Sequence, residues 1–129
     1  MLAVDTNFIL RYLLGDHPSQ SAKARAIIKN NEIFVCTTVL LETEWVLRSV
    51  YDFKPMQVAE ALTGVAGLPG VRFQDAALTA KALEWLAKGA DFADAMHYLA
   101  SEGCDAFVIF DTRLARKMER LGEIPVRTP

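Results

Sequence analysis

Aspartates follow two strand-like apolar runs of the sequence. Asp5 comes after "LAV" and Asp111 after "FVIF", and a threonine follows each acid. Because ligands of open parallel sheets collect outside the carboxyl ends of the strands, both acids are expected where chemistry could occur. Each acid could instead cap the helix that follows it, since a carboxylate there accepts backbone N–H groups. For either acid alone, both interpretations stay open.

Further acids stand near the starts of predicted helices. Glu42 lies one turn into a helix, and Glu44 points about 200° around the helix axis from it. We expect Glu42 to face the sheet edge and Glu44 to face solvent. In "DFADAM", Asp91 is expected to cap a helix, with a secondary role at an ion, and Asp94 is the better ligand candidate. The simpler alternative is that these acids merely favour a helix N-terminus.

Carboxylates gathered in one pocket need a cation. Two of them about 4 Å apart repel by roughly 4 kcal/mol at an effective dielectric constant of about 20. Oxygen ligands alone favour Mg²⁺ or Mn²⁺ over zinc. Asp5, Asp94 and Asp111 are therefore candidate metal ligands, and Glu42 binds the ion directly or through water. Together the four form a candidate catalytic set for metal-assisted phosphodiester hydrolysis.

The elements that must position these acids alternate between strands and helices. The sequence patterns predict strands at 2–5, 33–36, 70–74, 106–110 and 124–126, and helices at 6–15, 17–31, 38–53, 55–68, 75–90, 91–103 and 112–122. Thr6 or Asn7 is the expected cap of the first helix, and Thr37 or Thr38 that of the third. This order predicts an α/β fold with a mostly parallel sheet covered on both faces, formed by one domain over residues 1–129.

Composition limits the possible functions. Hydrophobic residues make up 52% of the 129 residues but occur in short groups, so no membrane span is expected. The N-terminus lacks the basic flank of a signal peptide, and we expect a cytoplasmic protein. Cys36 and Cys104 lie in apolar surroundings and are expected to be buried reduced thiols. The net charge of −2 gives no overall signal for polyanion binding.

Four segments in this order resemble the PIN domain, and within it the VapC-like toxins of toxin–antitoxin pairs. They are "VDTNFILRYLL", "TTVLLETEWVLRSVY", "GADFADAMHYLA" and "VIFDTRLAR". The resemblance implies a three-layer α/β/α sandwich, Mg²⁺-dependent ribonuclease activity, and an acidic quartet of Asp5, Glu42, Asp94 and Asp111. Thr6 matches the hydroxyl residue that follows the first acid. A homodimer and a cognate antitoxin protein are implied as well.

The chain departs from the family pattern at two positions. Ile109 stands where the family often has threonine, which removes a polar contact near the last acid. His97 occupies a place that is more often small or apolar, so it could approach the site, although a partly buried helix histidine is the simpler interpretation.

Cationic side chains follow Asp111 along the last predicted helix. Arg113, Arg116 and Arg120 form one stripe that could bind RNA phosphates, or could simply be solvated. Arg11 and Arg48 are weaker candidates and are expected to pair with acids. The aromatic side chains of Trp45, Trp85, Phe92 and Tyr98 are assigned to packing rather than to base stacking.

The sequence favours an RNA endonuclease that is a toxin, and alternatives remain. One is a PIN nuclease of RNA processing without an antitoxin, and another is a non-catalytic binding module. Against the latter, a scaffold has no reason to gather carboxylates that repel one another. A phosphotransfer enzyme is also conceivable, but Asn7 stands where such enzymes usually carry a second aspartate.

Overall fold

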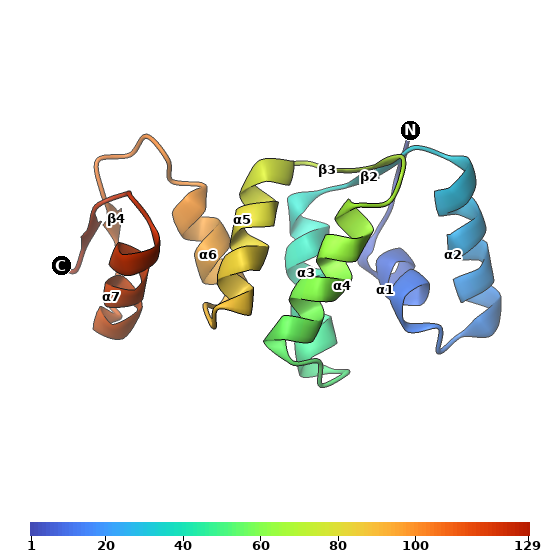
Figure 1. Cartoon of the computed structure of the whole chain (residues 1–129), viewed down its shortest axis with the longest axis horizontal. Helices are drawn as coiled ribbons and strands as arrows, with labels where there is room; N and C mark the ends of the chain where they lie inside the picture. The colour runs from blue at the N-terminus through green and yellow to red at the C-terminus, as the bar shows by residue number, and fades with distance from the viewer.

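The computed structural model describes all residues, 1–129, and shows strands and helices in the expected order (Figure 1). The strands are β1 (Leu2–Ala3), β2 (Ile33–Val35), β3 (Val71–Phe73), β4 (Phe107–Val108) and β5 (Val126–Arg127). The helices are α1 (Thr6–Leu14), α2 (Pro18–Asn30), α3 (Thr37–Ser49), α4 (Pro55–Ala66), α5 (Ala76–Ala87), α6 (Phe92–Leu99) and α7 (Thr112–Leu121). Every predicted element is confirmed, and the strands are shorter than predicted.

Helix ends follow from local chemistry, with two corrections to the predicted caps. The predicted cap of α1 at Thr6 or Asn7 is wrong, because Asp5 has extended backbone angles and its carboxylate accepts the N–H of Phe8. The predicted cap of α3 is also wrong, since Cys36 precedes the helix and its side chain makes no capping hydrogen bond. The N–H of Thr37 donates instead to the side-chain oxygen of Gln74 at 3.1 Å. Gly15 ends α1 at φ 66°, a left-handed conformation that glycine adopts without strain.

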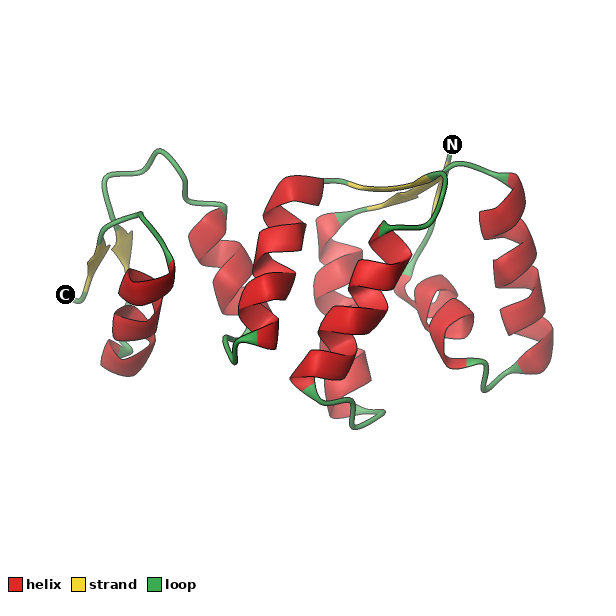
Figure 2. Ribbon diagram, in the orientation of Figure 1, coloured by secondary structure: helices red, strands yellow, loops and turns green.

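The strands form two separate parallel sheets. One has the order β1-β2-β3, with Leu2 opposite Ile33 and Ile33 opposite Val71. The other consists of β4 and β5 alone. In Figure 2 the strands accordingly appear at two places far apart, with helices between them. The α/β class and the parallel pairing are as expected, but the sheet is divided between β1 and β4.

The hydrophobic core runs through α1, α3, α4, α5 and α6, and it includes Met118 of α7. Tyr98 of α6 is its link to the C-terminal residues. The hydroxyl of Tyr98 donates a hydrogen bond to the carbonyl of Ile124 at 2.7 Å. Its ring lies 5.5 Å from that of Trp85 and 5.4 Å from that of Phe107. The segment from β4 to β5 is therefore held against α5 and α6 rather than against β1.

Several apolar side chains are more exposed than their apolar neighbours in the sequence indicate. Trp45 is 55% exposed, because α3 turns that face away from the core. Cys36 is half-buried and Cys104 is exposed, so neither is the buried thiol that its apolar neighbours suggested. Phe110, after β4, is 86% exposed because no strand or helix covers this edge of the small sheet. Trp85, Phe92 and Tyr98 are buried as expected.

None of the helices has the length and apolar character needed to cross a membrane. The longest are α2 and α3, with 13 residues each, which is shorter than the roughly 20 residues that such a span requires.

Candidate functional site

Asp5, Thr6 and Glu42 come together where β1 ends and α3 begins. Asp5 is exposed and caps α1, with its Oδ1 2.9 Å from the N–H of Phe8. Thr6, which is buried, donates a short hydrogen bond from Oγ1 to Oε1 of Glu42. The hydroxyl thus holds the Glu42 carboxylate beside the end of β1. Thr6 was predicted as a supporting residue, and its role in a site stays a prediction.

Glu42 and Glu44 point in different directions from α3, as predicted, but the surroundings of Glu44 are not the predicted ones. Glu42 is exposed and lies near Asp5, whereas Glu44 is buried. The expectation that Glu44 faces solvent is wrong, because Arg48 one turn later donates to it from Nε at 2.8 Å and Nη2 at 3.3 Å. The pairing offsets part of the cost of burying the Glu44 charge.

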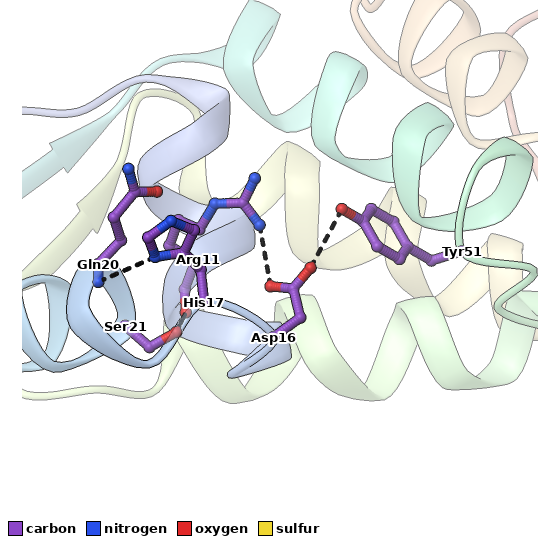
Figure 3. A network of polar contacts seen from close by, with 6 residues as sticks. All are labelled: Arg11, Asp16, His17, Gln20, Ser21 and Tyr51. Carbon is purple, nitrogen blue, oxygen red and sulfur yellow. Dashed lines mark hydrogen bonds and ion pairs between the residues drawn. The ribbon is translucent and has the colours of Figure 1, made fainter.

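A cavity of about 410 Å³ opens beside this first group of acids. Asp5, Thr6 and Glu42 line it together with Arg11 and Tyr51. Figure 3 shows that Arg11 and Tyr51 both point toward Asp16: Nη1 of Arg11 lies 2.9 Å from Oδ1, and the Tyr51 hydroxyl 3.5 Å from Oδ2. Arg11 is therefore an ion-pair partner, as expected. Asp16 and Tyr51 were not predicted as site residues. Asp16 follows the end of α1, and Tyr51 was assigned to the predicted helix 38–53, whereas α3 ends at Ser49.

Asp91, Asp94 and Asp111 form a second group around the starts of α6 and α7. Asp91 caps α6, as predicted, by accepting the N–H of Asp94 at 3.0 Å. Asp111 caps α7 by accepting the N–H groups of Arg113 and Leu114 at 3.0 and 3.1 Å. Capping is therefore a role of Asp5, Asp91 and Asp111 alike. It leaves their second carboxylate oxygens available to a ligand.

Asp94 is the acid whose surroundings disfavour its charge. Burial raises the pKa of the Asp94 carboxyl above its ordinary value, and the charges of Asp91 and Asp111 raise it further. His97 lowers the same pKa, so it acts on Asp94 across one helical turn. His97 itself is exposed, and the expectation of a partly buried histidine is wrong because this face of α6 is open. Its role in any site stays a prediction.

The two groups of acids do not meet within one chain. Asp5 follows a strand of the three-stranded sheet, and Asp111 follows a strand of the other sheet, at the opposite end of the molecule (Figure 1). The expectation that one sheet edge gathers both is therefore not met. The reason is that the C-terminal elements are attached to other parts of the chain. Tyr98 of α6 donates a hydrogen bond to Ile124, and Met118 of α7 is part of the hydrophobic core.

The chemistry of the donors suits a hard cation, because all of them are carboxylates. Their arrangement does not suit one: no group of three or more His, Cys, Asp or Glu side chains lies close enough to hold a metal ion. The acids of a single folded chain therefore do not fit a site for Mg²⁺ or Mn²⁺.

The predicted basic stripe does form one surface. Arg113, Arg116 and Arg120 are exposed and line a cavity of about 590 Å³ together with Thr112 and Glu119. Lys117, in contrast, donates from Nζ to the carbonyl of Gly89 at 3.0 Å and is a structural contact. The stripe starts two residues after Asp111, so cationic and anionic side chains adjoin at the N-terminus of α7.

Comparison with known families places most of this chain in one of them. The model of the PIN domain matches residues 2–119, which include all four predicted site acids and Thr6. No match was found among curated proteins. None was found among solved structures either. On the strength of that family match, the chain belongs to the PIN domain family, whose members are generally nucleases.

Proposed function

We propose that this protein is a metal-dependent endoribonuclease that hydrolyses RNA phosphodiester bonds and serves as the toxin of a VapBC-type toxin–antitoxin pair. The observation that carries the proposal is the PIN match over residues 2–119 in a chain that has carboxylates at all four expected positions. Asp5 and Glu42 stand at the end of β1, and Asp94 and Asp111 stand together by α6 and α7. In each pair, one acid lies at the N-terminus of a helix: Asp5 caps α1, and Asp111 caps α7.

The chain's own residues supply three functions in this proposal. Thr6 fixes the Glu42 carboxylate through its hydroxyl. Burial and like charge at Asp94 disfavour its ionised form, which is a common property of groups in catalytic sites. Arg113, Arg116 and Arg120 provide a cationic surface for the phosphates of RNA.

Mg²⁺ or Mn²⁺ is the cofactor proposed from donor chemistry alone, since the set consists of hard oxygen ligands. The two acid groups lie apart in the structure, so the metal site is proposed from the family match and the donor chemistry. The roles of Asp5, Glu42, Asp94 and Asp111 as catalytic residues, and of the first, third and fourth as ligands, are therefore part of the proposal.

The test is cleavage of a mixed set of RNAs with Mg²⁺, with Mn²⁺ and with a chelator. Asp5→Asn and Asp94→Asn should abolish cleavage that the wild type shows with either ion. Asparagine caps helices about as well as aspartate, so Asp5→Asn should keep α1 intact. Asp105→Asn is the matched control, because Asp105 is an exposed acid of a loop outside both groups. Cleavage by all variants at the wild-type rate would refute the acidic site.

The toxin role requires a partner. A small protein encoded beside this chain should bind it and suppress its cleavage of RNA. If the nuclease is active but no such inhibitor is found, the protein is better described as an RNA-processing nuclease.

A second function, a non-catalytic RNA-binding module, is favoured by one observation: the separated acids do not form a metal site within the chain. This function predicts retention of RNA on the Arg113, Arg116 and Arg120 surface without cleavage under any metal condition. Arg116→Glu would then weaken binding, while Asp94→Asn would not.

A further inference from the structure

Helix α1 carries two polar residues, Asn7 and Arg11, that separate two cavities. They are four residues apart, so they lie on one face of the helix. Both residues line the cavity of about 410 Å³ between α1 and α3, and both also line a second cavity, of about 220 Å³, between α1 and α2. Asp5 lines both cavities as well. Each cavity therefore starts at an acid of the candidate site and extends along one side of α1.

The cavity between α1 and α2 carries two cations. Lys23 and Gln20 of α2 line it together with Arg11. Lys23 is exposed and forms no ion pair, unlike Arg11, which is paired with Asp16. Ammonium, amide and guanidinium groups are all hydrogen-bond donors for phosphate oxygens. This cavity is thus suited to a phosphate group, whose charge the unpaired ammonium of Lys23 would balance.

Arg11 has hydrogen-bond donors to spare. Its guanidinium carries five N–H donors, but Oδ1 of Asp16, 2.9 Å from Nη1, is its one acceptor, and Nε is buried without any. Nη2 is therefore available to a second anion. Arg11 follows Asp5 at a separation that corresponds to about 9 Å along the axis of α1. A phosphate at Arg11 would thus be close to the acids without lying on them.

The cavity between α1 and α3 has an aromatic and aliphatic wall. Val46, Val50 and Tyr51 line it, and Val50 is 59% exposed, so other elements leave this wall open to a ligand. The two carboxylate oxygens of Asp16 accept hydrogen bonds from the Arg11 guanidinium and the Tyr51 hydroxyl, which fixes both groups beside the cavity (Figure 3). A fixed aromatic ring next to aliphatic side chains suits the flat face of an RNA base.

We infer that these two cavities bind one nucleotide of single-stranded RNA, with its phosphate at Arg11 and Lys23 and its base against Tyr51. The sugar then crosses α1 between the cavities. A base enters the cavity between α1 and α3 only when it is unpaired, so this surface selects single strands over duplexes. The inference rests on the proposed function for the identity of RNA as the ligand. It deepens that function by assigning recognition of the substrate to residues outside the acids.

Binding of a short, unstructured, fluorescently labelled RNA tests the phosphate position. Fluorescence anisotropy is measured on the full-length chain with Asp94→Asn, which is expected to stop cleavage, in the presence of Mg²⁺. Lys23→Gln should weaken binding several-fold and lower the slope of log K against log salt by about 0.7, because it removes one contact to a single-strand phosphate. Lys29→Gln is the matched control, since Lys29 is exposed on the same helix and lines neither cavity. Equal effects of the two substitutions would overturn the inference.

Two substitutions of Tyr51 test the base position in the same assay. Tyr51→Leu should weaken binding about tenfold, because it removes the ring on which the base stacks. Tyr51→Phe keeps the ring and loses only the hydrogen bond to Asp16, so it should bind within about twofold of the parent chain. If Tyr51 merely fixes the loop after α1, both variants lose binding alike, and that result contradicts stacking. Should Tyr51→Leu fail to fold, the comparison of Lys23→Gln with Lys29→Gln still decides the inference.

Strand selectivity gives a further readout. The same RNA annealed to its complement should bind at least about tenfold more weakly than the single strand, because a paired base must first leave its stack to enter the cavity. A duplex that binds as tightly as the single strand would overturn the base position.

Binding and cleavage together separate this inference from the proposed function. RNA cleavage by the wild type, with binding that neither Lys23→Gln nor Tyr51→Leu weakens, overturns the inference and leaves the nuclease. The expected losses of binding, beside a wild type that cleaves RNA under no metal condition, support the inference and overturn the nuclease. If Asp94→Asn still cleaves, the acidic site is refuted, and the same variants are compared with a chelator in place of Mg²⁺.

Discussion

Replacing Arg48 by methionine should destabilise the protein strongly, because it leaves the Glu44 carboxylate buried without its partner. The Glu44 side chain is 3% exposed, and both of its oxygens accept hydrogen bonds from Arg48. Breaking a fully buried ion pair costs about 3 to 5 kcal/mol. The Arg48 side chain is 36% exposed, so water reaches the outer side of the pair. We therefore expect a loss of about 2 to 3 kcal/mol in the free energy of unfolding.

Urea unfolding followed by far-UV circular dichroism measures this loss. The matched control is the double variant Glu44→Leu with Arg48→Met, which removes both charges and keeps an apolar side chain in each place. It should recover most of the stability, since an apolar pair of similar volume often replaces a buried ion pair without cost. A loss below about 0.5 kcal/mol for Arg48→Met, or a double variant no more stable than the single one, would refute the reasoning.

Three further predictions follow from other contacts. Gly122→Ala should cost about 1 to 3 kcal/mol in urea unfolding, because the added Cβ would lie 2.5 Å from Oη and 2.7 Å from Cζ of Tyr98, and closer still to Cε1. Tyr98→Leu should relieve part of that penalty, and a fully additive pair of variants would contradict the clash. Without metal, Asp94→Asn should melt above the wild type at pH 7, because a raised pKa in the folded state penalises the ionised form there. That advantage should shrink as the pH falls through the raised pKa of Asp94 and vanish below the ordinary aspartate pKa of about 3.9, where the acid is protonated in both states. A pH-independent difference would argue against it. Arg116→Glu should weaken RNA cleavage in a salt-dependent manner, and unchanged cleavage at low salt would count against the basic stripe.

Local patterns of the sequence determined the order and type of every element. Apolar runs ending at acids marked β1 and β4, and helical periodicity with proline and glycine at the ends marked the helices. The same patterns identified Asp91 as a cap and placed Thr6 near the acids. These features depend on residues close together in the chain, so their side chains and backbone spacing largely decide them.

The tertiary structure alone decided which strands became neighbours and which acids met. The run "AFVIF" predicts a strand, but no property of those residues says that β5, rather than β1, is its partner. Burial of Glu44 depended on Arg48 being able to reach it, and exposure of Trp45 on which face of α3 met the core. Sheet pairing and side-chain burial arise from contacts between segments that lie far apart in the sequence. The free energy of these contacts depends on both segments, so neither segment alone determines it. The sequence thus predicted the four acids, and the packing of Tyr98 and Met118 divided them into two pairs.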